Sequence, residues 1–150
     1  MPKPSKAKSK LAKSASKPTT AHSSLSEVYA GVEEVLRRYV PPFKAGDLVV
    51  KGKESLQLVT PKTIVVPGAY GGKPVNWQFA AAILQKGYVG FYLMGAHTNP
   101  ALKKKISPAL LKSLKGKSCF QLKALDEQIK KDMVVALDAS AEIYKERGWI

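Results

Sequence analysis

The sequence predicts an α+β protein in which an N-terminal helix and C-terminal helices pack on an antiparallel sheet of about five strands. Apolar side chains in residues 76–96 alternate with the period of two that is typical of strands. Residues 24–39 and 126–148 instead carry apolar stripes at helical spacing. With 150 residues, the chain has room for one such domain and a tail.

Residues 1–23 are predicted to be a disordered tail that precedes a domain of residues 24–150. The tail contains three prolines and no acidic residue, and its few apolar side chains cannot offset the entropy of ordering it. Lysines in such a segment bind polyanions without any folded site, through counterion release. The six tail lysines are therefore candidate polyanion contacts: Lys3, Lys6, Lys8, Lys10, Lys13 and Lys17.

A capping box predicts the start of the first helix. Ser24 and Glu27 are spaced so that each side chain can accept a hydrogen bond from the other residue's backbone N–H. The proline pair at 41–42 ends this helix. Its apolar stripe is expected in the core and consists of Leu25, Val28, Tyr29, Val32, Val35, Leu36 and Tyr39.

Short strands are expected at residues 48–51, 56–60 and 63–66, followed by a hairpin over residues 76–96. Its turn is Gln85-Lys86-Gly87, and Gly87 is expected to adopt positive φ. Both arms carry large apolar side chains on both faces, so either both faces are covered or one lines a groove. On the first arm, one side is expected to present Trp77, Phe79, Ala81 and Ile83.

Two short helices, a last strand and a long helix are expected after the hairpin. Asn99-Pro100 starts one helix, and Ser107-Pro108 caps another that stops at Gly116. Residues 118–122 form the strand. The closing helix begins near Asp126 and ends at Gly148, and the last two residues fold back onto the core.

Charge is unevenly distributed in this chain, whose net charge is +14. No acidic residue occurs between Glu54 and Asp126. This stretch is either a solvated face or a surface that binds nucleic acid or another polyanion non-specifically. No base-reading motif is apparent. The stretch contains ten lysines: Lys62, Lys73, Lys86, Lys103, Lys104, Lys105, Lys112, Lys115, Lys117 and Lys123. Of these, we name Lys103, Lys104 and Lys105 as candidate polyanion contacts.

Aromatic side chains near these lysines suggest a ligand groove on one sheet face. The alternatives are a plain core or the contact of a homodimer. The aromatic set is Tyr70, Trp77, Phe79, Tyr88, Phe91, Tyr92 and Phe120. The candidate ligand-binding residues are Trp77, Tyr88, Tyr92, Lys73, Lys117 and Phe120.

Cys119 and His97 are the only pair in the domain that could support nucleophilic catalysis. Cationic neighbours favour a reactive thiol, whereas a small buried residue on a strand is the simpler interpretation of Cys119. No metal-ligand cluster or cofactor motif is apparent, so we expect neither a metal nor a cofactor. The lone cysteine, the missing secretory signal and the absence of a long apolar run predict a cytoplasmic protein without a membrane partner.

Several stretches resemble the YdhG-like domain-of-unknown-function family over about residues 25–150: 88–94, 106–108, Gly116-Lys-Ser-Cys-Phe120 and 144–148. The resemblance implies a compact α+β domain with an antiparallel sheet and flanking helices. One branch of that family is linked to frataxin-like iron handling. Such iron binding relies on acidic surfaces, because hard cations prefer carboxylate oxygens, and the middle of this chain has none.

We therefore predict a non-enzymatic binding or interaction module whose basic surface engages anionic partners. The alternatives are a Cys119-dependent enzyme of unknown substrate and a frataxin-like iron-handling protein.

Overall fold

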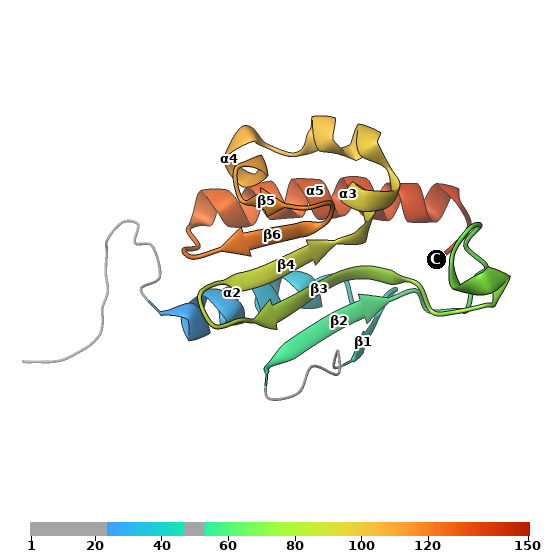
Figure 1. The fold of residues 1–150 in the computed structure, drawn as a ribbon, viewed down its shortest axis with the longest axis horizontal. Coiled ribbons are helices and arrows are strands. Elements are labelled where there is room, and N and C mark those ends of the chain that lie inside the picture. The colour runs from blue at the N-terminus through green and yellow to red at the C-terminus, as the bar shows by residue number, and fades with distance from the viewer. Residues whose placement is uncertain (1–23, 47–52) are drawn as a thin grey trace, which may run out of the picture.

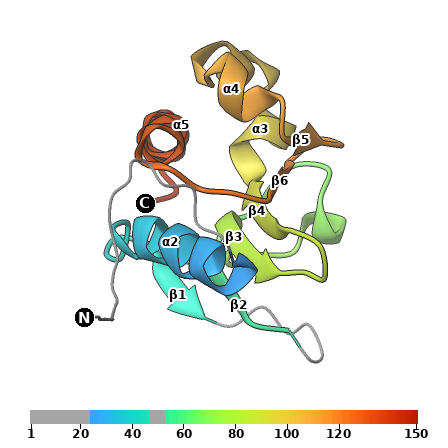
Figure 2. The ribbon, with the colours of Figure 1, turned by 90° about the vertical axis from the view of Figure 1, so that its left-hand side faces the viewer.

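Residues 24–46 and 53–150 are described by a computed structural model (Figure 1). Six antiparallel strands form one sheet in the order β1-β2-β3-β4-β6-β5. The long helices α2 and α5 lie together on one side of this sheet (Figure 2). The predicted α+β class is confirmed, with six strands in place of about five. The tail, the expected strand at 48–51 and its lysine lie outside the described residues.

Helix α2, Leu25–Arg37, begins at the predicted capping box. The Glu27 N–H donates to Ser24 Oγ at 3.1 Å, and the Ser24 N–H donates to Glu27 Oε1 at 3.4 Å. After the helix the chain turns back, and the buried Phe43 ring stacks on the Phe79 ring with centroids 3.9 Å apart. The helix buries most of the predicted stripe: Val28, Tyr29, Val32, Val35 and Leu36.

The sheet is built from two short edge strands and four central ones. Its members are β1 (Lys44–Gly46), β2 (Ser55–Val59), β3 (Gln78–Leu84), β4 (Val89–Leu93), β5 (Leu114–Lys115) and β6 (Cys119–Leu122). The strand expected at 63–66 is wrong. There, a single bridge joins Ile64 to Val75, because prolines 61 and 67 flank the segment and limit its pairing. The short 3₁₀ helix η1, Tyr70–Gly72, follows.

A shift of register decides which side chains of β3 face the helices. Leu58 pairs with Ala80 while the next residue, Val59, pairs with Gln78, so Phe79 has no partner on β2. Phe79 and Ala80 are both fully buried in the core. Such a bulge changes the parity of the strand. The expectation that Phe79 shares one side with Ala81 and Ile83 is therefore wrong.

Two glycines have roles other than those expected. The β3–β4 turn closes when the Gln85 N–H donates to the Tyr88 carbonyl at 2.9 Å, but Gly87 is not among the residues with positive φ. Gly116 has φ of +74° and lies between β5 and β6, so it does not end a helix. Positive φ is thus required at the second hairpin, where glycine adopts it without steric cost.

Short helices lead from β4 to β5: α3 (Met94–Thr98), η2 (Pro100–Lys105) and α4 (Pro108–Leu111). Ser107 caps α4 as predicted, accepting from the Leu110 N–H at 3.1 Å. Helix α5, Glu127–Glu146, is capped by Asp126, and Gly148 follows with φ of +74°. The half-buried Trp149 then folds back edge-on against the buried Tyr144 ring, as expected.

Gly95 on α3 allows a close approach to α5. A Cβ at this position would lie 2.5 Å from Ser140 Oγ and 3.0 Å from Leu102 Cδ2, closer than any ordinary contact. The Ser140 hydroxyl is buried and has no hydrogen-bond partner within residues 24–46 and 53–150. The contact between Gly95 and Ser140 therefore depends on close packing, and the Ser140 hydroxyl forms no hydrogen bond with a described residue that would offset its burial.

Gly95→Ala should lower the free energy of unfolding by about 1–3 kcal/mol, because overpacking outweighs the better helix propensity of alanine. Ser140→Ala alone should be neutral or stabilising, and in the double variant it should recover part of the loss. Urea denaturation of the three variants measures this coupling. Strictly additive effects would contradict the contact. Gly87→Ala is the control, because a Cβ there meets nothing within 4 Å.

Candidate functional site on the open face of the sheet

The register divides the sheet into a covered face and an open face. Apolar side chains point toward the helices and are buried: Leu56, Leu58, Ala82, Phe91, Leu93, Phe120 and Leu122. The opposite side, which we call the open face, presents mostly small or uncharged polar residues together with one isoleucine and one lysine. Its two paired rows are Gln57, Ala81, Tyr92, Cys119 and Lys115, and then Ser55, Ile83, Gly90 and Gln121. Ala81, Ile83 and Gly90 are buried there, and the other members of its rows are half-buried or exposed.

Tyr92 lies at the centre of the open face, and Gly90 makes room for it. A Cβ on Gly90 would lie 2.8 Å from Cε1 and 3.1 Å from the hydroxyl of Tyr92, so the ring reaches back along β4. Burial, with a smaller contribution from the neighbouring Cys119 thiol, raises the pKa of Tyr92 to about 12. The side chain of Gln85 has the opposite effect. The Tyr92 hydroxyl therefore stays protonated at neutral pH.

Several amide side chains lie on the same side of the sheet as this tyrosine, and that of Gln85 is next to it. Gln78 Nε2 donates to Gln57 Oε1 at 3.1 Å across β2 and β3. Gln85 accepts a hydrogen bond from the Lys53 ammonium group. Each amide carries both donors and an acceptor, so this part of the face can form hydrogen bonds with a polar ligand in either sense.

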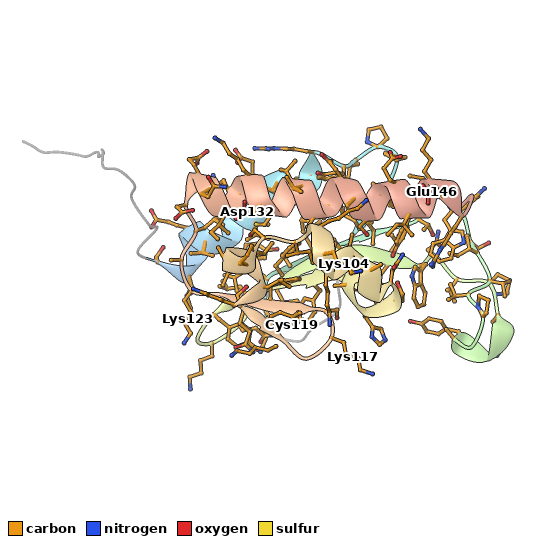
Figure 3. All side chains as sticks on the ribbon, turned by 90° about the horizontal axis from the view of Figure 1, so that it is seen from above. Lys104, Lys117, Cys119, Lys123, Asp132 and Glu146 are labelled. Carbon is orange, nitrogen blue, oxygen red and sulfur yellow. The ribbon has the colours of Figure 1, made fainter. Side chains whose placement is uncertain are left out.

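Four exposed lysines lie on the open face or at its ends, and we call them the rim lysines: Lys86 in the β3–β4 turn, Lys115 on β5, Lys117 in the β5–β6 turn and Lys123 after β6. In Figure 3, Lys117 and Lys123 lie with Cys119 on the side away from α5, whereas Asp132 and Glu146 lie along α5. The register adds Lys115, which pairs with Cys119. The rim lysines thus lie on the sheet side, and the acids of the described residues lie in or next to α2 and α5, apart from Glu54, which directly precedes β2.

Ion pairing follows the same division. Within the described residues the ion pairs are confined to α2, α5 and the residue after α2: Arg37–Glu33 at 3.0 Å, Arg38–Glu34 at 3.7 Å, and Lys130 with Glu34 at 3.6 Å and Glu127 at 3.5 Å. None of the ten lysines between Glu54 and Asp126 takes part in them, and all ten are exposed. The helix layer partly neutralises its own charge, and the sheet layer does not.

The structure separates the predicted ligand-binding residues into three places. Phe120 is fully buried on the covered face and is removed from the candidates, as Phe79 and Phe91 are from the aromatic set. Trp77 is 7% exposed and lies with Tyr70 and Lys73 before β3. Tyr88 directly precedes β4, at the other end of the seven-residue strand β3 and roughly 20 Å away. Tyr88, Tyr92 and Lys117 remain on the open-face side of the sheet.

The predicted catalytic pair is not brought into contact. His97 is exposed on α3, and no hydrogen bond joins it to Cys119 within the described residues. Cys119 is half-buried beside Tyr92. The lysines at 103–105 are exposed on η2, which packs on α3 and α5, away from the open-face rows.

The glutamines of the open face were missed by the sequence reasoning. A signal for them exists in the alternation of Ser55 and Gln57 with leucines, and of Cys119 and Gln121 with Phe120 and Leu122. Alternation of this kind is typical of a strand with one solvated side. This signal was missed because β3 and β4, the central strands, carry apolar residues at positions on both faces.

Residues 24–46 and 53–150 contain no group of three or more His, Cys, Asp or Glu side chains placed to hold a metal ion. No helix in them has the length and apolarity needed to cross a membrane.

Comparison of the chain with protein-family models, with curated proteins and with solved structures gave no match. The resemblance to the YdhG-like family therefore stays a prediction.

Tyr92→Phe should remove a phenol ionisation with a pKa of about 12 from the ultraviolet titration of the folded protein. In the unfolded chain a tyrosine ionises near pH 10, so stability should fall as the pH rises from about 10 to 12, and the variant should lose less of it. Cys119→Ala should lower the pKa of Tyr92. An unchanged ultraviolet titration in Tyr92→Phe would contradict the half-buried position of Tyr92 beside Cys119. Tyr144→Phe is the control, because it should keep the phenol ionisation of Tyr92.

Proposed function

We propose that this chain is a non-enzymatic binding module that engages anionic partners through the rim lysines around the open face. The observation that carries the proposal is the separation of charge between the two layers. The rim lysines are exposed and make no ion pair among the described residues, whereas acids of α2 and α5 are paired with nearby cations. Unpaired ammonium groups on one side of a molecule attract a polyanion without needing a cleft.

The spacing of strands in a sheet brings neighbouring lysines close enough for their electrostatic potentials to add. Neighbouring strands are about 4.8 Å apart and a packed layer is about 10 Å thick, while the Debye length in physiological salt is about 8 Å. Lys115 on β5 and Lys117 in the β5–β6 turn are two residues apart, so they act together on a ligand. Lys123 follows the other end of β6 and meets a different part of an extended polyanion. The carboxylates of α5 lie behind the sheet and are largely screened from it.

The tail lysines would add to this attraction by the same counterion release. Substitution of the rim lysines and substitution of the tail lysines would each remove one of these two contributions, so the two can be measured separately.

Lys117→Glu/Lys123→Glu should weaken binding of the full chain to heparin and to duplex DNA at least tenfold. It should also reduce the steepness of the salt dependence by about two units in a plot of log K against log salt. The matched control is Lys131→Glu/Lys145→Glu on α5, which changes the net charge equally and should weaken binding less than threefold. Fluorescence anisotropy over about 50–200 mM salt measures both effects.

Three outcomes would refute the proposal. Equal losses in the two double variants would mean that only the overall charge matters. Affinity that does not depend on salt would exclude counterion release. Loss of binding only when the six tail lysines are replaced by glutamine would assign the polyanion to the tail instead of the open face.

A further inference from the structure

We infer that the anionic partner of the open face is single-stranded nucleic acid, with bases against Tyr88 and Tyr92 and phosphates at the rim lysines. This inference rests on the proposed function and specifies its ligand. Heparin, polyphosphate or a duplex would need only the lysines. The uncharged tyrosine and glutamine side chains between the rim lysines favour a ligand that also carries bases.

The first reason is the arrangement of aromatic residues along β4. Tyr88, Gly90 and Tyr92 alternate with the core residues Val89 and Phe91, so they share the open face. Gly90 has no side chain that could stand between the two rings, and the Tyr92 ring extends over it. Both tyrosines are half-buried, which holds the rings while leaving part of each in contact with solvent.

The second reason is the chemistry between the aromatics and the rim. The open-face rows contain no carboxylate, so no group there would repel a phosphodiester backbone. Glutamine amides such as Gln57 and Gln121 can hydrogen-bond base edges, because they donate and accept as the bases do. An uncharged centre with a cationic edge matches a strand that carries its charge on one side and its bases on the other.

The third reason is shape, which favours a single strand over a duplex. The major groove of an undistorted duplex admits a helix or a two-stranded ribbon, and a six-stranded sheet face is too broad for it. A duplex also keeps its bases stacked away from such a face. Splayed bases can rest on aromatic side chains of a sheet, which is how antiparallel sheets with helices behind them bind RNA. Stacking of this kind tolerates any sequence, in agreement with the absence of a base-reading motif.

The test compares three probes on the full chain: an oligonucleotide of about 12 nucleotides, its duplex and heparin. Tyr88→Ala/Tyr92→Ala should weaken binding of the single strand at least tenfold and change binding of the duplex and heparin less than twofold. The matched control is Tyr70→Ala, because Tyr70 is exposed outside the open face and should leave all three affinities unchanged.

A second variant keeps the test valid if the double variant does not fold. Tyr92→Phe retains the ring and should keep single-strand affinity within twofold, whereas Gly90→Ala displaces the ring and should lower that affinity. Circular dichroism before each titration verifies the fold. An equal effect of Gly90→Ala on all three probes would overturn the inference.

The failures of the two proposals are distinguishable. If the wild-type chain binds duplex and heparin through the rim lysines but binds the single strand no more tightly after correction for charge, the nucleic-acid inference is wrong and the proposed function stands. If tyrosine substitution leaves single-strand affinity intact, the inference is again wrong. If the wild-type chain binds none of the probes, both proposals fail.

Discussion

The structure depends on the pairing register of β2 with β3. The shift between Leu58 and Val59 buries Phe79 and Ala80 together, so that Phe79 meets Phe43 and Tyr144 beneath the helices. From Ala80 onward the small residues of β3 align with the large ones of β4 on the covered face. A one-residue slip of β2 against β3 would turn the leucines of β2 outward and bring Gln57 into the core, where its amide would lack partners.

Local signals in the sequence predicted the ends of the helices correctly. Ser24 and Ser107 each cap a helix as expected, because a cap depends on residues three positions apart in the chain. Gly148 follows α5 for the same reason. The closing helix begins next to Asp126 as predicted, and the structure shows that Asp126 is its cap. These positions could be assigned without knowledge of the fold.

Features that depend on pairing between distant segments could not be assigned in this way. The bulge at Phe79 requires a comparison of β2 with β3, and the sequence of β3 alone suggests simple alternation. Gly116 was interpreted as a helix end because β5, only two residues long, has almost no signal of its own. For the candidate site, the structure places Tyr88, Tyr92 and Lys117 on the open-face side, and their role in binding stays a prediction. Phe120 was not predicted correctly, since only tertiary packing shows which face is covered.

The two-layer architecture also separates the residues that maintain the fold from those available for recognition. Helices α2 and α5 cover one side of the sheet, so almost all of the apolar core lies between these layers. Open-face positions such as Gln57, Gln121 and Lys115 have little part in that core. Mutation can therefore alter the surface chemistry of this domain at low cost in stability, which makes the face suited to divergence in nature and to engineering of new ligand preferences on an unchanged scaffold.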